Sequence, residues 1–357
     1  MSSPRLYAAR VHGGNAPENC IDFSAPMNPL APPPFLVHEL LHALHTVVRY
    51  PDPSYRKLVE ALAEIHGIEA PYVVPLNGAA EGYTLLIACL RPRRVVILEP
   101  TFGDRDIEAM CVALGIDVVH VAPKISGSAL RYSIESLEDL GLVEGDMLVL
   151  SDPCNPAGFC LDQRERRILE NLASDALIVV DEAFKTLTRC SPFKPRDGVV
   201  VLRSLTKELG VPGLRIGFLA ISDERLYRVL DACRQPWNVN SLASYIVTRI
   251  AESYLEDYRA FLEHSRQYIE SERQWLHTRL GRLPSLRVFG SDSPYLLVEH
   301  RALTHPDMQR RLVERGVYVR DCTSFYGLGP RYSRISVRLR HENEILVEAL
   351  EEVLRWC

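Results

Sequence analysis

The sequence predicts an α/β protein with a mostly parallel sheet flanked by helices and a smaller α+β domain at the C-terminus. The first observation is that apolar runs typical of buried strands alternate with helical stretches between Val73 and about Ala220. The second is a long helical stretch, roughly 241–280, that separates this region from further strands. The third is the length, because 357 residues can bury a large core and suggest two domains.

The elements are justified in chain order. Residues 1–50 are irregular and proline-rich, with a short helix expected near Phe35–Val47, and the apolar spacing within Pro53–Gly67 predicts another helix. The runs expected as strands are Val95–Leu98, Val118–Val121, Leu148–Leu150, Leu177–Val180, Val199–Leu202, Ile216–Ile221, Tyr295–Glu299, Val317–Arg320 and Arg334–Leu339. A final helix is expected after His341. We therefore expect an N-terminal segment (1–50) packed on the small domain, a large domain (51–260) and a small domain (261–357).

Composition indicates a soluble cytoplasmic protein. The net charge is −5 without a basic block, so neither nucleic acid nor a membrane surface is indicated as a partner. The N-terminus lacks the apolar core of a signal peptide, and no apolar run approaches the roughly 18 residues that span a bilayer. The nine cysteines are scattered, without a C-x-x-C pair, which predicts reduced thiols and no metal site. Cys154 and Cys322 fall inside motifs, where we expect them to pack.

Lys207 is the most informative single residue. It follows an apolar run, has hydroxyls nearby at Ser204 and Thr206, and is followed eight residues later by Arg215. This layout suits a lysine that forms a Schiff base with an aldehyde cofactor carrying a phosphate, which the hydroxyls and guanidinium can hold. Alone, Lys207 could equally be a surface lysine beside a turn.

Two further polar residues stand at the ends of buried strands upstream. Asn155 follows the run ending at Asp152, and Asp181 directly follows Ala176-Leu-Ile-Val-Val180. A carboxylate there is costly to bury without a charged partner, and a protonated pyridine nitrogen is such a partner. Alone, Asp181 could be a helix N-cap or part of a core ion pair, and Asn155 a turn residue.

The chain resembles fold-type I pyridoxal-phosphate enzymes of the aspartate aminotransferase superfamily, because it carries Asn155, Asp181, Lys207 and Arg215 in this order. The resemblance runs from about His12 to the C-terminus and implies a sheet of the seven-stranded type. Within the superfamily the chain is similar to histidinol-phosphate aminotransferases, and more similar to threonine-phosphate decarboxylases of cobalamin synthesis. The segments that carry this second likeness are His12-Gly-Gly-Asn15, Asp22-Phe-Ser24, Asn28-Pro-Leu30, Tyr50-Pro-Asp-Pro-Ser-Tyr55, Asp181-Glu-Ala-Phe184, Arg320-Asp-Cys322, Phe325-Tyr-Gly-Leu328, Arg334-Ile-Ser-Val-Arg338 and Glu342-Asn343.

The resemblance implies pyridoxal 5'-phosphate as the cofactor. Its implied contacts are phosphate binding by the glycine turn and by the hydroxyl–arginine set, and ring contacts from one aromatic, one amide and one carboxylate. These residues are Gly78, Ala79, Ala80, Ser204, Thr206, Arg215, Phe102, Asn155, Asp181 and Lys207. Tyr55 is expected to reach the phosphate of a neighbouring subunit, which implies a homodimer with shared active sites. Each could instead be an ordinary turn, core or surface residue.

Arginines mark the expected substrate end. Arg334, Ser336, Arg338 and Arg340 alternate with apolar residues, which predicts a half-buried strand with one basic face. By resemblance Arg320 and Arg338 bind anionic substrate groups, since the guanidinium fork favours carboxylate and phosphate. The residues expected at a phosphorylated amino acid substrate are His12, Asn15, Asn28, Asn155, Arg320, Arg334 and Arg338.

The resemblance favours decarboxylation of L-threonine O-3-phosphate, with Lys207 and Asp181 as catalytic residues. Phe184 supports this, because many aminotransferases carry a tyrosine there whose hydroxyl bonds the cofactor, and phenylalanine cannot. The alternative is an aminotransferase acting on histidinol phosphate or another amino acid with 2-oxoglutarate. A cofactor-sensing regulator is disfavoured, because such a protein needs a DNA-binding domain and the chain has no basic block.

Overall fold

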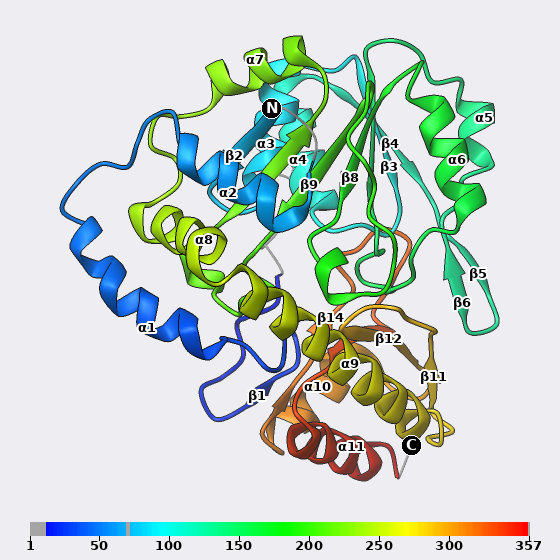
Figure 1. Cartoon of the computed structure of the whole chain (residues 1–357). Helices are drawn as coiled ribbons and strands as arrows, with labels where there is room; N and C mark the ends of the chain where they lie inside the picture. The colour runs from blue at the N-terminus through cyan, green and yellow to red at the C-terminus, as the bar shows by residue number, and fades with distance from the viewer. Residues whose placement is uncertain (1–11, 69–71, 356–357) are drawn as a thin grey trace.

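A seven-stranded sheet forms the centre of the computed structural model, which describes residues 12–68 and 72–355. Its strand order is β2-β10-β9-β8-β7-β3-β4, and all neighbours are parallel except β10, which is antiparallel to both β2 and β9 (Figure 1). The strands are β2 (Tyr72–Leu76), β3 (Arg94–Leu98), β4 (Asp117–Val121), β7 (Asp146–Ser151), β8 (Leu177–Asp181), β9 (Val199–Ser204) and β10 (Gly217–Ile221). The predicted mostly parallel α/β sheet is confirmed.

Helices cover both faces of this sheet, which is why its strands read as continuous apolar runs. Consecutive residues of one strand enter different cores: Val149 of β7 belongs to the core that includes helices α3, α4 and α7, and Leu148 to the core that includes α2, α6 and α8. The helices are α2 (Arg56–His66), α3 (Ala80–Leu90), α4 (Asp104–Leu114), α5 (Ser136–Leu140), α6 (Gln163–Leu172), α7 (Glu224–Cys233) and α8 (Ser241–Ser253).

A smaller antiparallel sheet, in the order β11-β12-β15-β14, follows the long helix α9 (Leu255–Leu280). Its strands are β11 (Leu286–Val288), β12 (Tyr295–His300), β14 (Arg320–Asp321) and β15 (Tyr332–Ser336), and the helices beside it are α10 (His305–Val313) and α11 (Arg340–Leu354). The strand expected over Arg334–Leu339 was too long. It ends at Ser336, and the Glu342 carboxylate accepts a hydrogen bond from the backbone N–H of Leu339 (3.1 Å), which starts α11.

The N-terminal segment contacts both parts of the molecule. Its strand β1 (Ile21–Asp22) pairs in parallel with β13 (Val317–Tyr318) beside the small sheet, as Figure 1 shows in blue and orange. Helix α1 (Pro34–Ala43), followed by the 3₁₀ turn η2 (Leu44–Thr46), instead packs on α8. The expectation that the segment packs on the small part alone was therefore incomplete. The remaining elements are β5 (Lys124–Ser126), β6 (Ala129–Arg131), η3 (Lys185–Leu187) and η4 (Pro212–Leu214).

Two cysteines correct the prediction of reduced thiols. Cys160 and Cys190 form a disulfide whose Cα atoms are 6.4 Å apart. The fold brings them together because their loops follow the adjacent parallel strands β7 and β8. Cys154 and Cys322 are buried free thiols, as expected. Among the described residues, no helix is both long enough and apolar enough to cross a membrane.

Candidate active site

A cavity of about 180 Å³ opens where β7, β8 and β9 end at their carboxyl edge. Parallel strands deliver their C-terminal residues to one edge of a sheet, which is the usual place for a site in this architecture. The predicted site residues that line the cavity are His12, Ala79, Ala80, Phe102, Asn155, Asp181, Ser204, Thr206, Lys207, Arg215 and Arg334. The structure thus brings together residues that lie more than 300 positions apart in the chain.

The side chain of Lys207 lies inside this cavity, and within the described residues its Nζ makes no hydrogen bond or ion pair. It stands 6.0 Å from the centre of the Phe184 ring. Burial, and then the positive charges of Arg334 and Arg215, lower the pKa of Lys207 to about 8, with Asp181 acting in the opposite direction. A lysine with a lowered pKa holds more of its amine in the neutral, nucleophilic form.

Asp181 ends β8 at the floor of the cavity. Its two oxygens accept hydrogen bonds from the Tyr83 hydroxyl (2.9 Å) and from the backbone N–H of Ala183 (2.9 Å). Burial raises the pKa of Asp181 to about 6, and those hydrogen bonds counteract the rise. Among the described residues, no cation forms a hydrogen bond with this buried carboxylate. A protonated ring nitrogen would fit this position.

Ser204, Thr206, Arg215 and the start of α3 form one wall of the cavity. The Ser204 and Thr206 hydroxyls lie 2.8 Å apart, and the Arg215 guanidinium packs against Gly78. A Cβ atom at Gly78 would lie 2.1 Å from Nη2 of Arg215 and would displace the guanidinium, and the φ of +79° favours glycine. Ala79 and Ala80 place the N-terminus of α3 beside these groups. Backbone amides, hydroxyls and a guanidinium together suit a phosphate group.

Arg334 faces the cavity from the small sheet. Its guanidinium donates to Oδ1 of Asn155 (2.5 Å) and to the backbone carbonyl of Ser24 (2.6 Å). Its Nε is buried and has no hydrogen-bond partner in the part of the chain that the structure describes. Burial and the nearby Arg320 lower its pKa to about 10, so it remains a cation at neutral pH. Arg334 is therefore a cation placed to bind an anionic group in the cavity.

Aromatic residues complete the lining. Phe102 faces the cavity beside His12, whose ring centre is 6.0 Å away and whose Nε2 lies 3.2 Å from a carboxylate oxygen of Asp106. Phe184 packs edge-on against Tyr295, with ring centres 5.1 Å apart. No hydroxyl projects from the position of Phe184. The flat faces of Phe102 and Phe184 suit a planar ring between the polar groups.

The cavity lining does not include the predicted residues Asn15, Asn28, Tyr55, Arg320 and Arg338. Asn15 is exposed and does not line the cavity. Asn28 is buried, and its amide donates to the Glu208 carbonyl (3.0 Å) and to the Ser265 hydroxyl (2.8 Å), so it ties the N-terminal segment to the loop after β9. The expected substrate contact of Asn28 is corrected, because both amide hydrogens are used within the fold.

The two arginines assigned to substrate by resemblance also lie outside the cavity lining, and their substrate role stays a prediction. Arg320 donates to the Ser324 hydroxyl (2.8 Å) and does not line the cavity. Arg338 donates to the Asp22 carbonyl (3.0 Å) and pairs with Glu342 (2.7 Å). The expected strand ends at Ser336, so Arg338 does not continue the face on which Arg334 lies.

Tyr55 does not fit its predicted role either. Its side chain is only 1% exposed, and its hydroxyl bonds the backbone of Val239, donating to the carbonyl (2.8 Å) and accepting from the N–H (3.0 Å). A hydroxyl held in its own core cannot reach a neighbouring subunit. By contrast Tyr50, five residues earlier, is 80% exposed.

Sequence reasoning missed three residues of the site or gave them no role: Tyr83, which contacts Asp181, and two residues of the cavity lining. Tyr83 was interpreted only as part of a helix, yet its hydroxyl holds Asp181. Its signal was its place one turn after Ala79 on the helix that opens at the cavity. Ser24 and Ser151 line the cavity. Ser24 stood in a quoted motif without an assigned role, and Ser151 stood at the end of a predicted strand.

Comparison with known proteins agrees with this site. Residues 18–351 match the family model described as aminotransferase class I and II. The chain is 30% identical to the threonine-phosphate decarboxylase of Salmonella typhimurium, over 96% of each chain. It is also 30% identical to the histidinol-phosphate aminotransferase of Chlorobaculum tepidum, over 96% of this chain and 97% of that one. The crystal structure of histidinol-phosphate aminotransferase from Clostridium acetobutylicum superposes with a TM-score of 0.82 at 22% identity, over 94% of this chain and 99% of that chain.

The chain belongs to the aminotransferase class I and II family and is a pyridoxal-phosphate-dependent enzyme. The particular relatives do not choose between two reactions, because the decarboxylase and the aminotransferase are equally similar in sequence. The choice depends on the cavity itself.

Proposed function

We propose that this enzyme decarboxylates L-threonine O-3-phosphate to (R)-1-amino-2-propanol O-2-phosphate, a step of cobalamin biosynthesis. The observation that carries the proposal is the phenylalanine at position 184 inside the lysine cavity. Many aminotransferases have a tyrosine there. The decarboxylase branch of the family resembles this chain at that position. The 30% identity to the Salmonella typhimurium decarboxylase, over 96% of the chain, is compatible with this assignment but does not decide it.

The residues of the cavity fit pyridoxal phosphate. We propose that Ser204, Thr206, Arg215 and the amides of Ala79 and Ala80 hold its phosphate. Phe102 would face its ring, with Asp181 near the ring nitrogen and Asn155 near the ring oxygen. When bound, the cofactor supplies an aldehyde for an amino group and a ring that accepts the electron pair of a broken bond.

The protein's own groups supply binding, orientation and proton transfer. Arg334 binds the substrate's carboxylate and orients it toward the buried wall of the cavity, since its guanidinium is fixed by Asn155 and Ser24. The Asp181 carboxylate keeps a cationic group opposite it protonated. The Lys207 amine, with its pKa lowered to about 8, delivers a proton to the α-carbon after CO₂ has left.

A second candidate function is transamination of histidinol phosphate or another amino acid with 2-oxoglutarate. It is supported by the 30% identity to the Chlorobaculum tepidum aminotransferase. Fold alone cannot separate the two reactions, because both use the same lysine and the same cofactor.

The deciding experiment is to incubate the enzyme, reconstituted with pyridoxal phosphate, with L-threonine O-3-phosphate and no keto acid. We expect CO₂ and the phosphorylated amino alcohol in equal amounts over many turnovers. Conversion of the cofactor to its amine form by histidinol phosphate, without CO₂ from threonine phosphate, would reassign the enzyme as an aminotransferase. L-Serine O-phosphate, which lacks one methyl group, is a matched substrate and should be discriminated by about tenfold to a hundredfold at most.

We also propose that the enzyme is a cytoplasmic homodimer. The supporting observation is an exposed apolar surface on α1 and the segment after it, formed by Val37, Leu41, Leu44, Val47, Val48 and Tyr50. Monomers rarely expose so many neighbouring apolar side chains. We expect light scattering to give a dimer mass, and a Leu41→Asp, Val48→Asp variant to give a monomer. A monomeric wild-type enzyme would overturn the proposal.

A further inference from the structure

A second cavity, of about 280 Å³, lies on the opposite side of β9 from the catalytic cavity. Consecutive residues of a strand point to opposite faces, and here Ser204 lines the catalytic cavity while Arg203 lines the second one. The loop that follows behaves in the same way. Lys207 faces the catalytic cavity, and Glu208 accepts a hydrogen bond from Tyr258, which lines the second cavity. The two cavities therefore share one wall.

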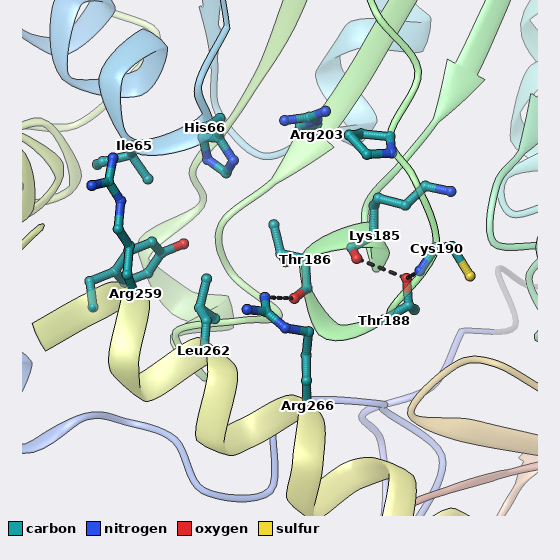
Figure 2. A pocket seen from close by; sticks show the side chains of 12 residues that line it. Ile65, His66, Lys185, Thr186, Thr188, Cys190, Arg203, Arg259, Leu262 and Arg266 are labelled. Carbon is teal, nitrogen blue, oxygen red and sulfur yellow. Dashed lines mark hydrogen bonds between the residues drawn. The ribbon is translucent and has the colours of Figure 1, made fainter. Parts of the chain in front are cut away.

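The lining of the second cavity is cationic. Figure 2 shows side chains of α9 on one side and those of His66 and Arg203 on the other. Its charged lining residues are Lys185, Arg203, Arg259 and Arg266, and no carboxylate belongs to the lining. Three of these cations are paired with carboxylates outside the lining, at distances of 2.7 to 2.9 Å. Arg259 is exposed and makes no ion pair or hydrogen bond with any residue of the described ranges, so its guanidinium is available to a ligand.

His66 adds an unused buried polar atom. Its side chain is only 2% exposed, and its Nε2 has no hydrogen-bond partner among the described residues. The nearest acid oxygen, Oε1 of Glu208, is 3.9 Å away. A buried polar atom without a partner costs about 1–3 kcal/mol, and a ligand that bonds it recovers that cost. Thr186, on η3, lines the same cavity, and its hydroxyl bonds the Glu208 carboxyl.

We propose that this cavity is a second binding site, for a small anion that carries a carboxylate or phosphate group. Arg259 and Arg266 of α9 supply positive charge, and His66 supplies an unused polar atom from the other side. With a volume of about 280 Å³, the cavity has room for a small organic anion. The proposal depends on no step of the proposed reaction.

The test is isothermal titration calorimetry of the enzyme loaded with pyridoxal phosphate, which keeps the phosphate wall of the catalytic cavity filled. Inorganic phosphate and succinate are titrated separately at physiological salt, so that the two anion chemistries are distinguished. We expect at least one of them to bind at one site per chain. Arg259→Gln should weaken that binding by about fivefold to tenfold, because it removes a charge-assisted hydrogen bond, and Arg259→Lys should weaken it less.

Two control variants separate this site from the rest of the protein. Arg228→Gln removes another exposed arginine, on α7, and should leave binding unchanged. Arg334→Gln changes the catalytic cavity and should also leave it unchanged. Absence of binding by both anions overturns the proposal, as does equal affinity in wild type and Arg259→Gln. Loss of binding in Arg334→Gln but not in Arg259→Gln would place the anion in the catalytic cavity and also overturn it.

Discussion

The two ends of the catalytic cavity are built in different ways. At the cofactor end, Asp181 and Ser204 stand at the ends of adjacent parallel strands, so the sheet itself brings them together. At the substrate end, Arg334 bonds the carbonyl of Ser24, 310 residues away in the chain, and only the packing of the N-terminal segment on the small sheet joins them. The residues of the cofactor end are therefore positioned by neighbouring strands of one sheet. Those of the substrate end are positioned by packing between distant parts of the chain.

The cofactor end should be the less tolerant of change, and Lys207→Ala tests this most strongly. We expect turnover of L-threonine O-3-phosphate to fall by on the order of 10⁴-fold, since the variant loses both the amine that holds the cofactor and the proton-transfer group. Released CO₂ measures it. Lys57→Ala, at an exposed lysine of α2, is the matched control and should keep wild-type turnover. Full turnover in Lys207→Ala would remove the proposed mechanism.

Asp181→Asn tests the charge at the same end while keeping the shape. We expect turnover to fall on the order of 10²-fold, because an amide cannot stabilise a cation opposite it. The absorption spectrum of the bound cofactor should change as well. Tyr83→Phe removes only the hydroxyl that holds the carboxylate and should cost much less. Equal activity of Asp181→Asn and wild type would mean that the buried carboxylate is structural.

The substrate end is tested by comparing Arg334→Gln with Arg338→Gln. Arg334 lines the cavity, so its loss should lower kcat/KM by about tenfold to a hundredfold, the value of a charge-assisted bond to an anion. Arg338 is bonded to Asp22 and Glu342 outside the cavity, so its loss should leave kcat/KM nearly unchanged and cost about 1 kcal/mol of stability. Steady-state kinetics and urea unfolding measure the two effects. A larger kinetic loss in Arg338→Gln would restore the assignment made from sequence.

The same contrast explains how far the sequence could be interpreted. Strands, their parallel order and the residues at their ends follow from apolar runs and turn residues, so Asn155, Asp181 and Lys207 could be predicted together. The different positions of Arg334 and Arg338 could not be predicted from the sequence, because they depend on where β15 ends. The alternation of polar and apolar residues over Arg334–Leu339 is compatible with a longer strand. The strand is shorter because helix α11 begins at Arg340.

Side chains that serve the fold were also hard to distinguish from side chains that serve the site. Asn28 and Tyr55 stand in motifs shared with the family, yet their polar atoms are satisfied by backbone groups from distant parts of the chain. A motif records that a residue type is suited to a position, but not which partner it meets. That partner is set by packing between α9, α8 and the N-terminal segment, which no short pattern describes.

The smallest effect is expected behind the cofactor end, at Glu208. Burial raises the pKa of this carboxyl to about 7, although hydrogen bonds from Thr186 and Tyr258 oppose the rise. A raised pKa means that the folded state holds a proton that the unfolded chain releases, so this contribution to stability is full below about pH 4.5 and is lost as the pH rises toward 7. In Glu208→Gln that loss should disappear, and the difference in unfolding free energy between variant and wild type should change by on the order of 1 to 3 kcal/mol across this range. Urea unfolding at several pH values measures this difference. The same comparison between wild type and the Lys57→Ala variant gives the background pH dependence. A difference that does not vary with pH would show that Glu208 is ionised in the fold, and that the wall behind Lys207 carries a charge rather than a proton.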